Sequence, residues 1–167
     1  DKTTILGFSQ THLSGTGLTE WGDFMLMPVV SDVPLVAGPE TNPDDGYRSR
    51  FSHEDETASP GYYQVRLQDY DINVELTATE RVAMHRYTFP DEEDRTVLMD
   101  FDHHIQHSSK HSYVRIHDET TVTGYRITDS HWANSRFMYF ALKFSEPMTS
   151  HMLRNRIRNL DNENIPE

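Results

Sequence analysis

The sequence predicts an all-β protein built as an antiparallel β-sandwich. Apolar residues recur with a period of two in many short segments, and turn-forming residues separate these segments. No segment before His151 carries a convincing helical stripe of apolar residues. Many short strands joined by turns are typical of sandwiches, and 167 residues fit one domain or part of a larger one.

The first strands can be justified in chain order. Residues 24–30 (FMLMPVV) are almost continuously apolar, which is typical of a buried strand, and Pro28 indicates a bulge or a sheet edge. Residues 62–68 and 72–79 alternate apolar and polar side chains, and the turn-forming sequence QDYDIN joins them. The expected inner faces of these two strands consist of Tyr63, Val65 and Leu67, and of Ile72, Val74, Leu76 and Ala78.

The later strands follow the same logic. Four further alternating segments continue the series: 81–89, 96–101, 112–117 and 122–127. Residues 137–144 (FMYFALKF) are apolar or aromatic at nearly every position, which predicts a strand buried on both faces. Two polar segments, 37–46 and 52–61, are predicted to be long loops, where binding sites tend to lie.

Composition excludes several classes of function. The net charge of −12 disfavours nucleic acid as a partner, because phosphates require a basic surface. The chain has no cysteine, which excludes a thiolate nucleophile or a cysteine-ligated metal. No apolar run reaches transmembrane length, and no signal peptide is visible. A hydrophobic share of 35% is low, which favours the interpretation that part of the apolar surface contacts a partner domain.

The segment GFSQTHLSGTG, residues 7–17, is the first candidate site. Its glycines allow close backbone approach or a positive φ, and its hydroxyl and imidazole groups suit a polyhydroxylated ligand. An ordinary strand followed by a Ser/Gly turn explains the same residues. The segment is not a phosphate loop, because the required lysine is absent.

Two other segments concentrate titratable groups. His53 lies beside Glu54, Asp55 and Glu56, and paired carboxylates can perform acid–base hydrolysis if their pKa values differ; a solvated loop is the alternative. The segment DHHIQHSSKH, residues 102–111, offers histidines for zinc or iron, although a polar connection between strands explains it equally.

Several of these motifs together resemble one family. They are GFSQTHLSGTG, FMLMPVV, YRSRFSHEDETASPGYY, VELTATERVAMHRYTFP and GYRITDSHWANSRFMYFALKFSEP. In this order they are similar to the amino-terminal domain of glycoside hydrolase family ninety-two, the calcium-dependent exo-acting alpha-mannosidases. The resemblance runs from about Ile5 to Met148.

The resemblance implies a β-supersandwich of the galactose-mutarotase type that meets a carboxy-terminal helical domain, with the active site at the junction. It implies hydrolysis of alpha-mannoside glycans with inversion, by carboxylates roughly 6.5–9.5 Å apart. These carboxylates and the calcium come largely from the helical domain, so no catalytic residue and no metal ligand is expected in residues 1–167. We therefore expect a sandwich that is incomplete at both ends, from a protein exported by a bacterium to the periplasm, cell surface or medium.

The resemblance also assigns roles to individual residues. Thr11, His12, Ser14 and Gly15 are expected to bind substrate at the junction. Gln10 stands where the family has a histidine, so it can form hydrogen bonds but cannot titrate. His53, Glu54 and Glu56 are expected to line the pocket or to contact the helical domain, whereas His85 and Arg86 are expected to be polar partners in the sandwich core.

Two other functions compete with this one. A freestanding carbohydrate-binding module would present exposed aromatic side chains on one face, for which the sequence offers Trp21, Tyr47 and Trp132. A histidine-ligated metal enzyme would instead use the histidines of residues 102–111, namely His103, His104, His107 and His111.

Overall fold

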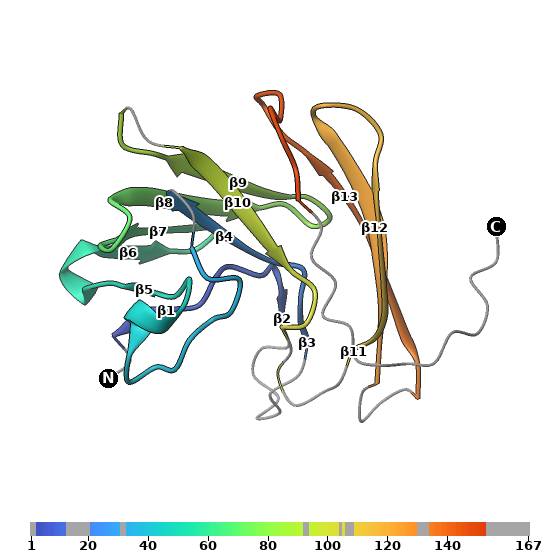
Figure 1. Ribbon diagram of the computed structural model, residues 1–167, viewed down its shortest axis with the longest axis horizontal. Helices are drawn as coiled ribbons and strands as arrows, with labels where there is room; N and C mark the ends of the chain where they lie inside the picture. The colour runs from blue at the N-terminus through green and yellow to red at the C-terminus, as the bar shows by residue number, and fades with distance from the viewer. Residues whose placement is uncertain are drawn as a thin grey trace. The chain divides into compact units, whose positions relative to one another are not determined.

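The computed structural model describes residues 3–12, 21–30, 33–91, 94–103, 105, 109–129 and 134–152. These ranges contain β-strands and two single 3-10 turns, with no α-helix among them, which confirms the all-β prediction (Figure 1). No helix in the described part of the chain is long and apolar enough to cross a membrane. The elements are β1 Thr4–Ile5, β2 Thr11–His12, β3 Trp21–Asp23, β4 Met25–Val30, η1 Pro43–Asp45, β5 Ser49–Arg50, η2 His53–Asp55, β6 Glu56–Ser59, β7 Tyr62–Leu67, β8 Ile72–Ala78, β9 Ala83–Thr88, β10 Arg95–Asp100, β11 Ser109–Ile116, β12 Thr121–Thr128 and β13 Arg136–Lys143.

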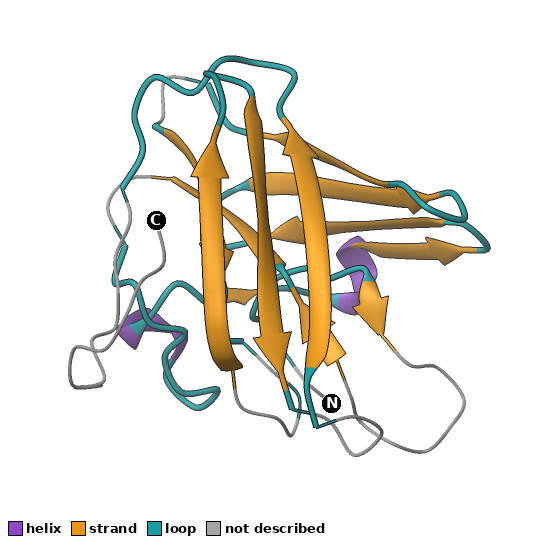
Figure 2. Ribbon diagram, turned by 90° about the vertical axis from the view of Figure 1, so that its right-hand side faces the viewer, coloured by secondary structure: helices purple, strands orange, loops and turns teal. Residues whose placement is uncertain are grey.

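The strands form five sheets. The largest has the order β6-β7-β8-β9, a second has the order β11-β12-β13, and β4-β10, β1-β5 and β2-β3 form pairs. The strands of the three pairs and of the four-stranded sheet are antiparallel, and the arrows of the three-stranded sheet alternate in direction (Figure 2). By internal contacts the chain divides into two units, Asp1–Ser112 with Arg126–Met138 and Tyr113–Tyr125 with Tyr139–Glu167.

A two-layer sandwich forms the core of the first unit. Alternate side chains of β4 pack against the inner face of β7 and β8, as the period of two predicts. Each of these fully buried apolar side chains stabilises the fold by about 1.5–3 kcal/mol. The buried cluster comprises Phe8, Met25, Met27, Val29, Tyr47, Val65, Leu67, Tyr70, Ile72 and Val74.

Pro28 lies at a sheet edge and not at a bulge. Strand β4 pairs with β10 along its whole length, with Pro28 opposite Val97 and no shift of register. On its other side, the pairing of β4 with described residues is an isolated bridge, in which Phe8 and Leu26 exchange two backbone hydrogen bonds of 2.8 and 2.9 Å. A residue without an N–H group is tolerated at such an edge.

Three expectations about strands were wrong. Residues 52–61 are not a continuous loop, because they contain η2 and β6, which pairs with β7 through a turn containing Pro60 and Gly61 at φ 79°. Ala78 is exposed, because it lies at the end of β8 beyond the sandwich interior. Strand β13 is not buried on both faces: burial alternates along it, and Tyr139 is 71% exposed.

Candidate functional site

The described part of the opening candidate segment forms one strand of a small hairpin. Thr11 pairs with Asp23 and His12 with Trp21. The hydroxyl groups of Ser9 and Thr11 both donate to the carbonyl oxygen of Asp23, at 2.6 and 3.1 Å. The start of the segment is therefore held to Asp23 of β3 by three contacts, namely the strand pairing of Thr11 and the two hydroxyl hydrogen bonds. Of the other predicted substrate-binding residues, Ser14, Gly15 and the side chain of His12 lie outside what the structure describes.

A buried ionic cluster lies behind this hairpin. The Asp23 carboxylate is 1% exposed and accepts two hydrogen bonds from the Arg136 guanidinium, at 2.7 and 3.1 Å. Arg136 also donates to the Thr128 hydroxyl at 3.0 Å, and its guanidinium carbon lies 5.1 Å from the centroid of the Trp21 ring. A bidentate pair of this kind, further held by cation–π stacking, fixes the orientation of β3.

Arg126 completes the cluster. Its side chain is fully buried, with Nη1 3.8 Å from the Asp23 carboxylate. It donates hydrogen bonds to the His103 carbonyl and, at 3.3 Å, to the Ser109 hydroxyl. Burial lowers the pKa of Arg126, while the nearby carboxylates of Asp23, Asp100 and Asp102 oppose that shift. The cluster thus places two cations against one buried carboxylate.

Sequence reasoning missed Asp23, Arg126 and Arg136. The sequence did contain one indication of this cluster. Arg126 lies four residues after the apolar Val122, so both side chains are expected on the same, inward face of the strand. A charge at such a position must be paired, because an isolated buried charge is too costly. Its partners could not be named from the sequence, since Asp23 and Arg136 are separated by 113 residues.

Gln10 connects the hairpin to the four-stranded sheet. Its amide nitrogen lies 3.1 Å from Nε2 of His85, and Nδ1 of His85 lies 2.7 Å from the Tyr87 hydroxyl. Burial lowers the pKa of His85 and raises that of Tyr87, so both groups stay neutral near pH 7. His85 is thus a partly buried polar partner of Tyr87, which itself packs against the core. Arg86, which the sequence also predicted as a core partner, is instead exposed and pairs with Glu75 at 2.6 Å.

Of the second predicted group, His53, Glu54 and Glu56, the structure brings the side chains of His53 and Glu56 into contact. His53 Nδ1 lies 2.6 Å from one Glu56 oxygen, and the Tyr63 hydroxyl donates to the other at 2.6 Å. These two hydrogen bonds lower the pKa of Glu56, which favours its ionised form and makes it a poor proton donor. Glu54 is exposed and contributes only its backbone N–H, which donates to the Ser52 hydroxyl at 3.2 Å.

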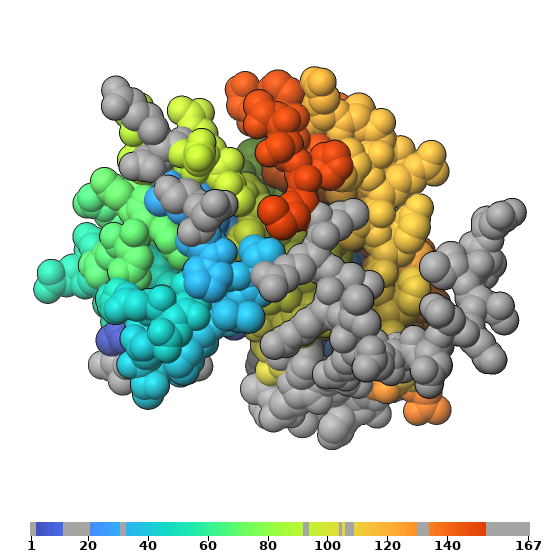
Figure 3. Space-filling view, viewed as in Figure 1, coloured from blue at the N-terminus to red at the C-terminus, as the bar shows by residue number. Residues whose placement is uncertain are grey.

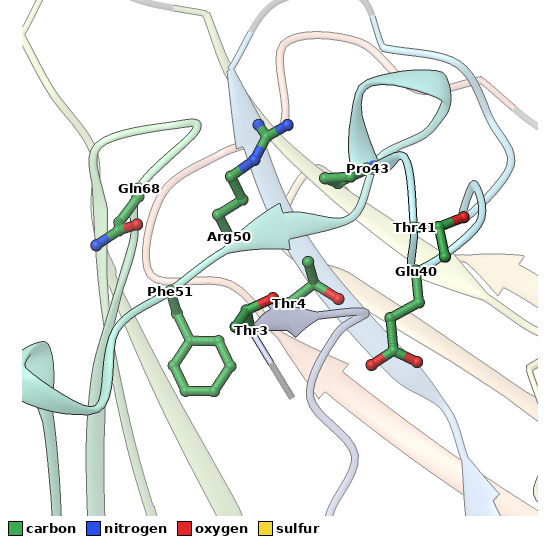
Figure 4. A pocket seen from close by; sticks show the side chains of 8 residues that line it. All are labelled: Thr3, Thr4, Glu40, Thr41, Pro43, Arg50, Phe51 and Gln68. Atoms are coloured by element: carbon green, nitrogen blue, oxygen red, sulfur yellow. The ribbon is translucent and has the colours of Figure 1, made fainter. Parts of the chain in front are cut away.

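An open depression of about 340 Å³ lies beside this group, at the 37–46 segment (Figure 4). Figure 3 shows part of that segment, in light blue and cyan, at the surface of the first unit. Arg50 lines the depression, but Asp44 and Asp69 neutralise it at 2.9 and 2.6 Å. The other lining residues are Thr3, Thr4, Glu40, Thr41, Pro43, Phe51 and Gln68. They provide no nucleophile with an adjacent base.

The two competing functions, a carbohydrate-binding module and a histidine-ligated metal enzyme, depend on aromatic side chains and on the histidines of residues 102–111. Tyr47 is buried and donates to Asp100 at 2.5 Å, so it is not an exposed platform. Trp21 is partly buried with Arg136 over its ring, and Trp132 lies outside the described residues. His104 and His107 also lie outside them. Among the residues that the structure describes, no three histidine, aspartate or glutamate side chains are grouped to hold a metal.

Comparison with known proteins identifies the family. Residues 1–165 match the model of the glycosyl hydrolase family 92 N-terminal domain. A solved family GH92 alpha-mannosidase of Bacteroides thetaiotaomicron is 40% identical, with a TM-score of 0.85 over 89% of this chain and 20% of that one. The complex of that enzyme with mannoimidazole gives the same values.

A curated relative agrees. A protein of Arthroderma benhamiae, named an uncharacterized secreted glycosidase, is 31% identical over 100 residues, which are 54% of this chain and 12% of that protein. The chain therefore spans only about one fifth or less of the relatives it matches. The match over nearly all residues confirms the resemblance found in the motifs: the chain belongs to the glycosyl hydrolase family 92 N-terminal domains.

Proposed function

We propose that the full-length protein is an inverting exo-alpha-mannosidase and that residues 1–167 form part of its amino-terminal sandwich domain. The observation that carries this proposal is the family match over residues 1–165. The 40% identity to an enzyme named as an alpha-mannosidase supports the substrate class. The complex of that enzyme with mannoimidazole supports a mannose-shaped site in the relative.

This chain would contribute binding and orientation. We assign substrate binding to Thr11, His12, Ser14 and Gly15, on the segment that leaves β2. The support is physical: the Asp23 cluster and two hydroxyl bonds to the Asp23 carbonyl hold the start of this segment rigidly. Rigid support from a second layer of residues is what allows a binding loop to keep its geometry.

Gln10 lies at the corner of this site. The Gln10 amide is tied to His85, which supplies an imidazole close to the position where the family has one on residue 10. We assign His53 and Glu56 to a contact with the helical domain, because His53 is exposed and two hydrogen bonds already use the partly buried Glu56 carboxylate.

The bond-breaking groups belong to the helical domain in this proposal. An inverting glycosidase needs an acid and a base that flank the bond with room for water. Calcium would be bound there too, as the family resemblance implies. The name of the curated relative supports a protein that acts outside the cytoplasm.

An assay of the full-length protein on a chromogenic alpha-mannoside tests the proposal. We expect release of the chromophore, loss of release with a calcium chelator, and initial formation of the β-anomer of mannose by NMR. Residues 1–167 alone should hydrolyse nothing. Turnover by the isolated segment, or none by the full-length protein with calcium present, would contradict the proposal.

A further inference from the structure

Three buried nitrogen donors around the Asp23 carboxylate have no acceptor among the residues that the structure describes. They are Trp21 Nε1, Arg126 Nη2 and Arg136 Nε. The two guanidinium groups both approach the Asp23 carboxylate, Arg136 at 2.7 Å and Arg126 at 3.8 Å. The Trp21 ring lies against the Arg136 guanidinium, 5.1 Å from its carbon atom. Buried N–H donors in proteins are nearly always paired, so three unpaired donors in one cluster require an explanation.

Arg126 has the least complete set of partners. Its side chain is fully buried, and its hydrogen bonds go to neutral oxygen atoms, the His103 carbonyl and the Ser109 hydroxyl. The Asp23 carboxylate, at 3.8 Å, is too far from Arg126 for a hydrogen bond, whereas both of its oxygens bond to Arg136. A buried guanidinium without a hydrogen-bonded anion is strongly destabilising.

Two other carboxylates lie near Arg126 without bonding to it. Asp100 and Asp102 act on Arg126 through space, and Asp102 is exposed to solvent. Both oxygens of Asp100 already accept hydrogen bonds, one from the Tyr47 hydroxyl and the other from two backbone N–H groups. Two buried guanidinium groups therefore share one hydrogen-bonded carboxylate, which leaves positive charge at Arg126 to be compensated.

An acceptor for these three donors must be small. The donor atoms are buried from solvent, so neither a sugar nor a side chain of another domain reaches them without opening the fold. A water molecule accepts two hydrogen bonds, but it leaves the charge of Arg126 uncompensated. A monatomic, monovalent anion meets both requirements, because it accepts N–H bonds from several directions and carries the opposite charge. Chloride is the most abundant anion of this kind in biological fluids.

We propose that the cluster around Asp23 binds one chloride ion through these three donors, with Arg126 Nη2 as the principal one. The ion stabilises the folded state, because it binds the assembled cluster and not the unfolded chain. It also supports the geometry of β3, whose Asp23 carbonyl oxygen accepts hydrogen bonds from the Ser9 and Thr11 hydroxyls. The inference goes beyond the mannosidase activity proposed above, because it predicts ion binding that needs no turnover.

Thermal unfolding of the full-length protein tests this site. Sodium gluconate replaces sodium chloride at constant ionic strength, because gluconate is too large to enter the cluster. The melting temperature should be higher in saturating chloride by at least about 2 °C. Trp21→Phe keeps a ring beside Arg136 but removes one donor, so it should weaken the apparent affinity for chloride at least about threefold. Arg66→Gln, at an exposed arginine, is the matched control and should keep the full response to chloride.

Crystals of the full-length protein grown with bromide in place of chloride locate the ion directly. Bromide scatters X-rays anomalously, so an anomalous peak within hydrogen-bond distance of Arg126 Nη2 would support the proposal, even in a protein without any turnover. Density for a water molecule there, without an anomalous peak, would overturn it. Equal melting temperatures in chloride and gluconate, or an equal response to chloride in wild type and Trp21→Phe, would also overturn it.

Discussion

Asp23 is the residue on which the geometry of the candidate site most depends. Asp23→Asn removes the only carboxylate that both Arg136 and Arg126 contact in the described cluster, and it leaves buried cations without their anion. We expect a loss of about 3–5 kcal/mol in the free energy of unfolding. Chemical denaturation of the full-length protein measures this loss.

Arg66→Gln provides the matched control for Asp23→Asn. Arg66 pairs with Asp71, but both side chains are more than half exposed. Exposed pairs contribute only about 0–1 kcal/mol, so this variant should unfold almost like the wild type. Similar losses for the two variants would show that the Asp23 cluster is not the structural support that we infer.

His85 gives the protein a predictable dependence on pH. Burial lowers its folded-state pKa below 6.5, so the unfolded chain binds a proton that the folded chain does not. Stability should therefore fall as the pH drops below about 6.5 towards the folded pKa, with no contribution from His85 at higher pH. The fall should be smaller in His85→Gln, measured by thermal unfolding between pH 5.5 and 7.5. An NMR titration that places the His85 pKa above 6.5 would contradict this account.

Gly124 allows the strands on both sides of β12 to approach closely. A Cβ atom at this position of β12 would clash with the Tyr113 carbonyl oxygen and would lie 2.6 Å from the Phe140 ring. Gly124→Ala should therefore destabilise the sheet by roughly 1–3 kcal/mol. The second variant Phe140→Leu should recover part of that loss in the double mutant, because it removes the ring from the contact. Additive losses would show that the clash is relieved elsewhere.

The elements also show what sequence patterns can and cannot predict. The hairpin β7–β8 was predicted almost to the residue, because alternation and a polar turn determine both strands locally. Strand β6 was missed because Glu56–Ser59 has no apolar alternation and is a strand only through its pairing with β7. The exposure of β13 was missed because a continuous apolar run does not show whether one face or two faces are covered.

At the scale of the molecule, the family and the sandwich could be predicted from motifs, whereas the candidate site could be predicted only in part. The hydroxyl-rich segment was visible because its residues are contiguous. The Asp23 cluster that holds it joins β3, β12 and β13, which only the fold brings together. Figure 1 shows how far apart these strands lie in chain order, from blue to orange. In the proposed function, the domain serves as a frame for the segment that would contact the sugar.

Replacement of His12 by alanine in the full-length protein tests this claim most directly. The measurement is kcat/KM on a chromogenic alpha-mannoside, together with the melting temperature of the same preparation. If the segment after β2 faces the sugar, kcat/KM should fall by about tenfold or more while the melting temperature changes little. An unchanged kcat/KM with a lowered melting temperature would contradict the account, because His12 would then serve only the fold.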